Sequence, residues 1–246
     1  MMLKTGIYVD SLNIQMNGGY GIRYDTLYRY AERNGTVIRA DAYLCEDRDR
    51  KKDDPEYRAN ITTYHKRLRA SGFKVIVSAI AKYVERDETF IKANVDMDIA
   101  LDILHQARYL DRIILLTGDG DFTRLVETVQ NYGTRVELIA FQNVSTRLAA
   151  MADVYTNGFI IPGLLPCERQ RGYSVRYNSD KGFGFLRYFS DDMKPSDIFF
   201  HISEVDRQEV FDSDRLTPIF EFTPSEDENG KPRAVDLKVV TQDGNM

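Results

Sequence analysis

Apolar residues follow two different patterns along this chain, and the pattern changes after Ile161. Before Ile161, short apolar runs alternate with segments in which apolar residues recur at helical spacing. The expected strands are residues 6–9, 37–44, 73–77, 112–116 and 135–140, and the expected helices are residues 24–33, 55–70, 96–110, 121–132 and 145–151. Repeated strand–helix–strand units predict an α/β domain whose parallel sheet is covered by helices on both faces.

Beyond Ile161 the helical spacing disappears and short strands rich in aromatic residues follow. The expected strands are residues 172–177, 182–189, 197–202, 217–222 and 233–240. Short strands separated by turn-forming residues predict a small closed all-β barrel. The sequence therefore predicts two domains, residues 1–160 and 171–246, joined by a linker at 161–170.

Composition places the chain among ordinary soluble proteins. Hydrophobic residues make up 43% of its 246 residues and charged residues 29%, and no apolar run is long enough to span a bilayer. A strand is expected from residue 6 onward, so we expect no signal peptide before it. Cys45 and Cys167 lie far apart, and neither has a second ligand nearby, so both are expected to be reduced. We expect a cytoplasmic protein without a membrane partner; the sequence leaves its oligomeric state open.

The net charge of −5 argues against a wholly basic surface for nucleic acid, but the charge is unevenly distributed. Residues 168–246 contain 11 basic and 16 acidic residues, which leaves 22 of each in residues 1–167 from totals of 33 and 38. Within the acidic C-terminal part, residues 171–187 contain four basic residues and only one acidic residue, Asp180. This local basic charge is typical of a binding face.

Four acidic residues lie where a parallel sheet gathers its functional groups, just beyond the carboxyl ends of strands. Asp10 follows the first strand, Asp119 and Asp121 follow the strand 112–116, and Asp96 begins a helix near the same edge. Like charges repel, so such a cluster predicts a bound divalent cation. Carboxylate oxygens suit Mg²⁺ or Mn²⁺, which assist the attack of water on a phosphodiester.

Several neighbours of these carboxylates are candidates for the same site. Asn13 is placed to hydrogen-bond a carboxylate or a phosphate, as is the Thr117 hydroxyl, and Gly118 and Gly120 allow a tight turn. A single Asp after a strand is more often a helix cap, however, and Asp121 can fill that role. We expect a solvated side chain at Asp98 and consider Asp102 a weaker candidate ligand.

Three motifs resemble the NYN-domain family of PIN-like nucleases, in its LabA-like branch. They are Tyr8-Val9-Asp10-Ser11-Leu12-Asn13, Lys92 with Val95-Asp96, and Thr117-Gly118-Asp119-Gly120-Asp121-Phe122. The likeness covers about residues 4–158. It implies a PIN-like fold and RNA hydrolysis with Mg²⁺ or Mn²⁺ held by Asp10, Asp96, Asp119 and Asp121. The chain departs from the family at Thr117, where serine is more usual, and at Asp98, which adds a charge.

Basic residues in the first domain are candidates for contacting phosphates. Lys92 precedes the helix that carries Asp96 and is the better candidate. The run Arg48-Asp49-Arg50-Lys51-Lys52 is the weaker one, because a charge run in a loop is usually a solvated surface.

Aromatic residues in the barrel alternate with other residues in two strands. Alternation places Phe183 and Phe185 on one face together with Lys181, and it places Phe199 and His201 on one face of the other strand. Alternating aromatic residues are more often core than binding surface. Here glycines alternate with the rings, which lets another backbone or a ligand approach closely, and charged groups share the face of the rings. Both features favour a platform on which bases stack.

The motifs Lys181-Gly182-Phe183-Gly184-Phe185 and Asp197-Ile198-Phe199-Phe200-His201 resemble the two ribonucleoprotein signatures of cold-shock domains. The likeness extends over about residues 171–240. It implies an OB-type barrel that binds single-stranded RNA or DNA through Tyr177, Phe183, Phe185, Phe199 and His201. Arg176 stands where that family usually has tryptophan, so a cation replaces one stacking ring and binding can become more dependent on salt.

The sequence supports three hypotheses for function. The first is a metal-dependent ribonuclease, an endonuclease, whose barrel captures single-stranded RNA. The second is a regulator that binds RNA without cleaving it and retains the acidic pocket. The third, a small-nucleotide phosphatase or nucleotide-binding module, leaves the barrel unexplained and lacks a phosphate-binding P-loop.

Overall fold

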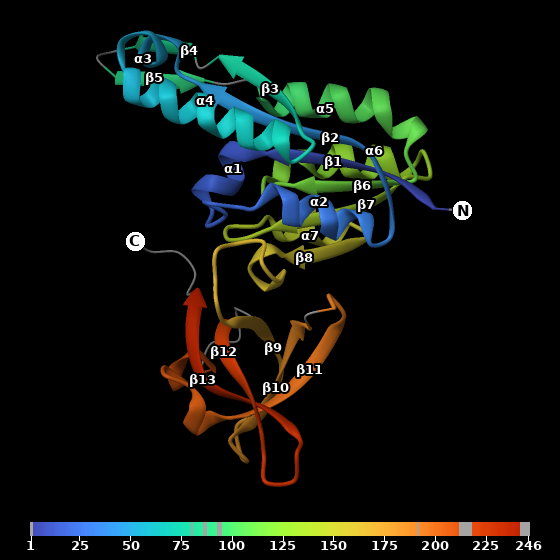
Figure 1. Cartoon of the computed structure of the whole chain (residues 1–246). Coiled ribbons are helices and arrows are strands. Elements are labelled where there is room, and N and C mark those ends of the chain that lie inside the picture. Colours follow the sequence, from blue (N-terminus) through green and yellow to red (C-terminus); the bar gives the residue numbers. More distant parts are fainter. Residues whose placement is uncertain are drawn as a thin grey trace. The chain divides into compact units, whose positions relative to one another are not determined.

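The computed structural model describes residues 2–79, 81–85, 88–92, 95–190, 192–211 and 218–241, and the side chains of residues 79–94 and 241 lie outside that description. The chain divides into two compact units, one built around the strands β1, β2 and β6 and the other around the strands β9 to β13 in Figure 1. The first unit contains residues 1–20 and 24–156, and the second contains residues 21–23 and 157–246.

The first unit contains a six-stranded sheet in the order β3-β2-β1-β6-β7-β8. Its strands are β1 (Leu3–Asp10), β2 (Gly35–Glu46), β3 (Lys74–Ala79), β6 (Arg112–Leu116), β7 (Arg135–Ala140) and β8 (Val154–Asn157). Strand β1 pairs in parallel with β2 and β6, and the pairs β2–β3 and β6–β7 are also parallel. Every residue of the central strand β6 is buried, as expected for a strand covered on both faces.

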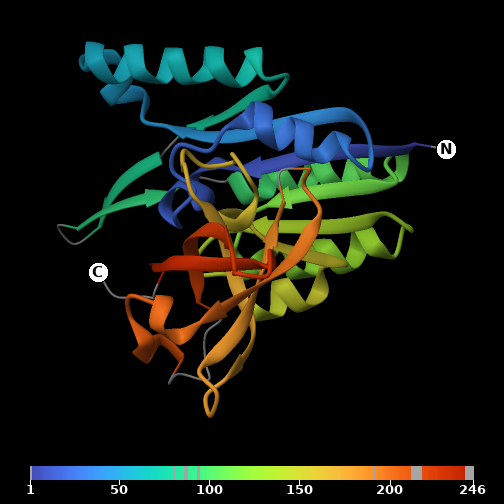
Figure 2. The same ribbon diagram turned by 60° about the horizontal axis from the view of Figure 1, so that its bottom comes forward.

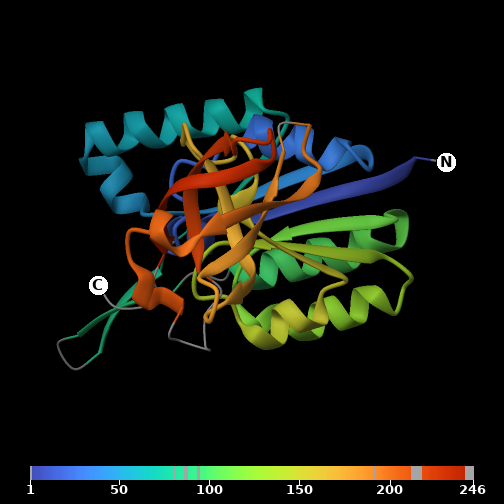
Figure 3. The same ribbon diagram turned by 90° about the horizontal axis from the view of Figure 1, so that it is seen from below.

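Helices cover both faces of this sheet, as Figure 3 shows. The helices are α1 (Ser11–Met16), α2 (Tyr24–Glu32), α3 (Arg48–Asp53), α4 (Pro55–Ala70), α5 (Val95–Gln106), α6 (Thr123–Gln130) and α7 (Thr146–Met151). Apolar residues of α5, α6 and α7 pack in one core cluster with Tyr8 and Tyr43 of the sheet. Helices α2 and α4 lie on the other face.

Four elements of the first unit were not expected from the sequence. They are α1, α3, strand β8 and an antiparallel ribbon of β4 (Ala81–Glu85) and β5 (Glu88–Lys92), which projects in Figure 2. Helix α3 contains the basic run 48–52, so the expectation of a loop there was wrong. Asp47 caps this helix by accepting a hydrogen bond from the Arg50 backbone N–H at 3.1 Å. The short, polar elements lack the apolar periodicity on which a sequence-based assignment relies.

The second unit is a closed five-stranded barrel in the order β10-β11-β13-β12-β9. Its strands are β9 (Gln170–Asn178), β10 (Phe183–Phe189), β11 (Pro195–His201), β12 (Ile219–Glu226) and β13 (Pro232–Thr241). The core of the barrel contains Leu186, Phe200, Phe220, Phe222 and Leu237, each fully buried. The fold expected from the sequence, a helix-covered parallel sheet followed by an OB-type barrel, is therefore confirmed.

Short 3-10 turns complete the described structure: η1 (Ala107–Tyr109), η2 (Gly120–Phe122), η3 (Gly158–Ile160), η4 (Ile202–Glu204) and η5 (Gln208–Phe211). The segment expected to be a linker is packed within the second unit. Leu164 is fully buried, and its carbonyl accepts a hydrogen bond from the Arg23 backbone N–H at 2.8 Å. None of the described helices is both long and apolar enough to cross a membrane.

Candidate functional site

Asp10 is a buried carboxylate at the carboxyl end of β1, with only 4% of its surface exposed. It caps helix α1, because Oδ1 accepts a hydrogen bond from the Asn13 backbone N–H at 3.1 Å. Its Oδ2 accepts a hydrogen bond from the Thr117 hydroxyl, also at 3.1 Å. The two bonds fix both oxygens, so this side chain cannot turn freely within the site.

Asn13 and Thr117 join the loop after β6 to helix α1. The Asn13 side-chain oxygen accepts a hydrogen bond from the Gly118 backbone N–H at 2.8 Å. The Thr117 hydroxyl oxygen accepts a hydrogen bond from the Asp119 backbone N–H at 3.3 Å while its proton goes to Asp10. Thr117 therefore has the carboxylate contact suggested by its sequence position, whereas the Asn13 amide oxygen bonds backbone and not a carboxylate.

Asp119 and Asp121 lie in the turn that follows Thr117. Asp119 caps η2 by accepting a hydrogen bond from the Asp121 backbone N–H at 2.9 Å. Asp121 is exposed, and helix α6 begins two residues later without a side-chain cap. The capping alternative considered for Asp121 is thus wrong, because Asp119 is the residue that caps.

Gly120 allows this turn to pack against the loop between β7 and α7. A Cβ atom at this position would lie 2.8 Å from the Ser145 hydroxyl oxygen, closer than real Cβ contacts allow. Ser145 in turn donates its backbone N–H to the Gly118 carbonyl at 2.9 Å. The glycine is therefore required by this close approach of two loops.

The four carboxylates are close enough to perturb one another. Burial is the largest cause that raises the pKa of Asp10 to about 6; the negative charges of Asp96 and Asp119 contribute to this rise, and the hydrogen bonds from Asn13 and Thr117 oppose it. Burial also raises the pKa of Asp96, with additional contributions from Asp119 and Asp121. Among residues with described side chains, none forms an ion pair with any of the four.

Cys45 is a neighbour of the site that the sequence did not single out. Burial raises the pKa of its thiol to about 11, and the charges of Asp10 and Asp96 add to that effect. A thiol with so high a pKa remains protonated near neutral pH and is a poor ligand for a hard cation. Only the parallel register of β2 beside β1 places it there, and this register is not visible in the sequence.

The donor set fits a hard divalent ion, although the described side chains contain no group of three Asp, Glu, His or Cys residues already arranged to hold a metal. Mg²⁺ usually retains several waters and takes only one or two carboxylates together with substrate phosphates. Binding of Mg²⁺ therefore does not require a complete set of protein ligands that is already in place before the ion binds. The buried carboxylate Asp10 and its acidic neighbours could offer oxygen ligands to such an ion, and no described side chain forms an ion pair that would compete for them.

Two further acidic residues of α5 have structural partners. Asp98 Oδ2 accepts a hydrogen bond from the Ser78 hydroxyl at 2.5 Å, so the expectation of a merely solvated side chain was wrong. Asp102 accepts a hydrogen bond from the buried Tyr43 hydroxyl at 2.8 Å. Lys92, a candidate for contacting phosphate, lies outside the residues whose side chains are described.

Two of the four basic residues in the run 48–52 of α3 form ion pairs with neighbouring carboxylates. Arg50 pairs with Asp54 at 3.2 Å, and Lys51 pairs with buried Glu46 at 2.5 Å. The Arg50 guanidinium also lies 4.6 Å from the centre of the Tyr57 ring. These contacts favour the structural interpretation of the run over a phosphate-binding one.

Three phenylalanine rings form an open cluster on the outside of the barrel. Phe183 and Phe185 of β10 and Phe199 of β11 have ring centroids 5.8–6.4 Å apart. Phe199 is 36% exposed, whereas its neighbour Phe200 is fully buried. The alternation expected from the sequence therefore directs these rings outward, and bases can stack on them.

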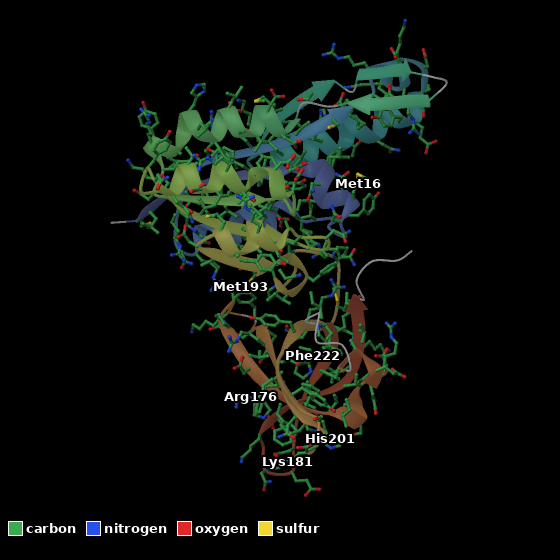
Figure 4. All side chains as sticks on the ribbon, turned by 180° about the vertical axis from the view of Figure 1, so that it is seen from behind. Met16, Arg176, Lys181, Met193, His201 and Phe222 are labelled. Atoms are coloured by element: carbon green, nitrogen blue, oxygen red, sulfur yellow. The ribbon has the colours of Figure 1, made fainter. Side chains whose placement is uncertain are left out.

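His201 and Lys181 border this ring cluster. His201 lies opposite Phe183 across β10 and β11 and is exposed, with Nδ1 2.9 Å from the Ser203 hydroxyl. Lys181 is also exposed, but it lies in the turn before β10, where Gly182 has a φ of +64°. Figure 4 labels both residues on the barrel. Lys181 is thus a turn residue and not a member of the ring-bearing strand.

Tyr177 does not belong to the ring cluster. Its ring stacks on Phe211 at a centroid distance of 4.2 Å and on the core residue Phe200 at 6.2 Å. The neighbouring Arg176 is exposed and lies opposite Phe185 in the register of β9 and β10. Consecutive strand residues point to opposite faces, so Tyr177 and Arg176 cannot share one surface.

Gly184 has a role inside the barrel. A Cβ atom there would lie 2.6 Å from the Phe200 ring and 2.5 Å from the Arg176 carbonyl oxygen. The glycines between the rings suggested space for a ligand. At Gly184 that space is taken by the Phe200 ring.

Comparisons with known proteins show the family of the first unit. The family model of the NYN domain matches residues 4–161. The LabA protein of Synechococcus elongatus, "Low amplitude and bright protein", is 31% identical over 58 residues, which are 24% of this chain and 31% of that protein. The chain thus aligns with about a third of the length of this relative.

A solved structure of a protein of unknown function from Vibrio parahaemolyticus is 29% identical, with a TM-score of 0.51. The match covers 63% of this chain and 93% of that one. NYN domains are members of the PIN-like nuclease superfamily, and the family model covers more than half of this chain. The chain therefore belongs to the NYN domain family.

Proposed function

We propose that this protein is a Mg²⁺- or Mn²⁺-dependent ribonuclease that cuts phosphodiester bonds within single-stranded RNA. The observation that carries the proposal is the state of Asp10. This carboxylate is 4% exposed and held by two hydrogen bonds, yet it has no basic partner among the described side chains. An isolated buried carboxylate is unfavourable, so a partner of opposite charge is the simplest reason for keeping it there.

Asp10, Asp96, Asp119 and Asp121 would hold the ion. When bound, it would neutralise the site and lower the pKa of a water for attack on phosphorus. Thr117 is a positioning residue that orients Asp10, and Asn13 ties the loop carrying Asp119 to helix α1. The acidic field of the four carboxylates repels RNA phosphates until a cation is present, which makes metal dependence an expected property of the site.

The barrel supplies the second half of the proposal. Exposed Phe199 and half-buried Phe183 and Phe185, whose side chains lie on the outer face of the barrel, offer a stacking surface that tolerates any base. A paired helix keeps its bases stacked on one another, so this surface selects unpaired strands. The barrel thus captures single-stranded RNA and raises its local concentration for the α/β unit.

The test is cleavage of end-labelled single-stranded RNA by the full chain in Mn²⁺, Mg²⁺ or EDTA. We expect internal products with either metal and none in EDTA, and a loss on the order of 10²- to 10³-fold for Asp119→Asn. Asp111→Asn is the matched control, because Asp111 precedes β6 at the opposite edge of the same sheet. An unchanged cleavage rate for Asp119→Asn would refute the assigned site.

A second function is favoured by one observation. The described side chains include no group of three residues already arranged to hold a metal. A regulator that binds RNA without cleaving it would not need such a group. Tight binding of RNA without products in either metal would establish this alternative.

A further inference from the structure

The ring cluster on the barrel is bounded on both sides by arginines at the same level of the sheet. Phe185 lies opposite Arg176 of β9 on one side and opposite Phe199 of β11 on the other. Phe199 in turn lies opposite Arg233 of β13. The register therefore places a row of four residues, Arg176–Phe185–Phe199–Arg233, across four neighbouring strands.

All four side chains of this row lie on the outer face of the barrel. The residues that follow Phe199 and Arg233, namely Phe200 and Ala234, are fully or almost fully buried in the barrel core. Because side chains alternate along a strand, Phe199 and Arg233 point outward. Both arginines are exposed.

A β-bulge gives Arg176 its outward direction. The pairing of β9 with β10 shifts between Phe185 and Leu186, so that Val175 has no partner. Val175 and Arg176 are both exposed, while Tyr177 packs inward. A bulge of this kind redirects side chains and is frequent beside functional sites.

Among the described residues, the side chains of these two arginines form no hydrogen bond or ion pair, in contrast to three other arginines of the barrel. Those three are paired: Arg169 with Asp236, Arg171 with Glu221 and Arg187 with Asp197. The Oδ1 atom of Asp227 accepts hydrogen bonds from the backbone N–H groups of Asn229 and Lys231, both at 2.8 Å. The hydrogen bond from Lys231 is the main cause that lowers the pKa of Asp227, and the charge of Arg233 contributes to the same effect. Residues 168–246 carry a net charge of −5, so two arginines without an ion-pair partner beside the ring cluster require an explanation.

We propose that Arg176 and Arg233 bind two backbone phosphates of one single strand whose intervening bases stack on Phe185 and Phe199. The strand then crosses the barrel from β9 to β13, over about 14 Å at the usual spacing of neighbouring strands. This inference rests on the proposed binding of single-stranded RNA and specifies its contacts. The guanidinium groups contact phosphate and the rings contact base faces, so the row itself reads no sequence.

Salt dependence separates phosphate contacts from stacking contacts. Each phosphate neutralised on a single strand contributes about 0.7 to the slope of log K against log salt concentration. Arg176→Gln and Arg233→Gln should each reduce that slope by about 0.7, and the double variant by about 1.4. Arg176→Lys should retain the slope, and Phe185→Ala should lower affinity by roughly 5- to 150-fold without changing the slope.

The experiment is fluorescence anisotropy of labelled oligouridylate and oligothymidylate with the full chain in EDTA, over a series of salt concentrations. The matched control is the double variant Arg187→Gln/Asp197→Asn, which removes a neutral exposed pair from the same face and should leave the slope unchanged. The slope changes are expected with both oligonucleotides, because phosphate and base stacking are common to RNA and DNA.

Unchanged slopes in Arg176→Gln/Arg233→Gln, with wild-type binding intact, would overturn this inference alone. Failure of the wild-type protein to bind either oligonucleotide would overturn it together with the RNA-binding half of the proposed function. Cleavage is absent from the assay, so a failed nuclease assignment cannot be mistaken for either result.

Discussion

The two units of this protein depart from the usual distribution of residues in opposite ways. In the α/β unit a carboxylate that would ordinarily be exposed, Asp10, is 4% exposed, and in the barrel the ring of Phe199 is 36% exposed. Buried charge and clustered exposed rings both reduce the stability of the unit that contains them. Each departure is supported locally, by hydrogen bonds around Asp10 and by ring–ring contacts around Phe199.

We interpret these two opposite departures from the usual burial of residues as support for the two proposed chemistries. A buried acid attracts a cation, and an open ring cluster attracts bases. The first requires rigid positioning by Thr117 and Asn13, whereas the second requires only an accessible surface.

The largest expected effect sharpens the contrast between inward and outward rings of β11. Phe200→Ala should destabilise the barrel by about 3 to 5 kcal/mol, because it empties a fully buried site in the core. Phe199→Ala, one residue away, should change stability little and instead weaken binding of single-stranded RNA. Chemical denaturation and anisotropy on both variants measure this, and equal stability losses would contradict the assigned directions.

The second prediction concerns the stability cost of Asp10. Its pKa lies at about 6 in the folded protein against 3.8 for the ordinary side chain, so the folded state binds the proton more tightly. Without metal, the free energy of unfolding of the α/β unit should therefore fall by about 3 kcal/mol as pH rises from about 4 to about 6. It should remain at the lower value above pH 6. Asp10→Asn should remove this loss.

The measurement is denaturation of wild type and Asp10→Asn in EDTA, followed by far-UV circular dichroism. Asp111→Asn serves as the control, because its exposed carboxylate lies at the other edge of the sheet. A wild-type protein that gains stability over the same rise in pH would contradict a buried, unpaired Asp10.

A smaller effect is expected at Thr117. Thr117→Val keeps the shape of the side chain but removes the hydrogen bond to Asp10 Oδ2. Loss of such a partner behind a metal ligand typically lowers activity by roughly 10- to 100-fold. Thr117→Ser retains the hydroxyl and should stay near wild type in the cleavage assay; equal losses in the two variants would show that the hydroxyl does not act through Asp10.

Much of the fold was accessible from the sequence because its signals are local. The parallel strands, the long helices and the barrel strands follow from the spacing of apolar residues. The rule that functional groups gather at carboxyl ends of strands predicted the positions of Asp10, at the end of β1, and Asp119, after β6, whereas their role in metal binding stays a prediction. The NYN resemblance is confirmed by a family model over residues 4–161.

The errors came from contacts between segments distant in sequence. The resemblance to cold-shock domains placed Tyr177 among the stacking residues, whereas its ring packs on Phe211 and Phe200. The bulge at Val175 in the pairing of β9 with β10 is not visible in the sequence. Asp98 was expected to be solvated because its partner, Ser78, lies on another strand. Gly184 suggested space for a ligand, whereas the Phe200 ring of the next strand fills it.

The central claim is that the acidic neighbourhood of Asp10 exists to hold a divalent ion. Its most direct test is anomalous diffraction from crystals of the full chain grown with Mn²⁺, compared with crystals of Asp10→Asn. The account predicts a manganese peak bounded by the carboxylates of Asp10 and Asp119 in the wild type and its loss in the variant. A wild-type crystal without manganese at these carboxylates, at a concentration that supports cleavage, would contradict it.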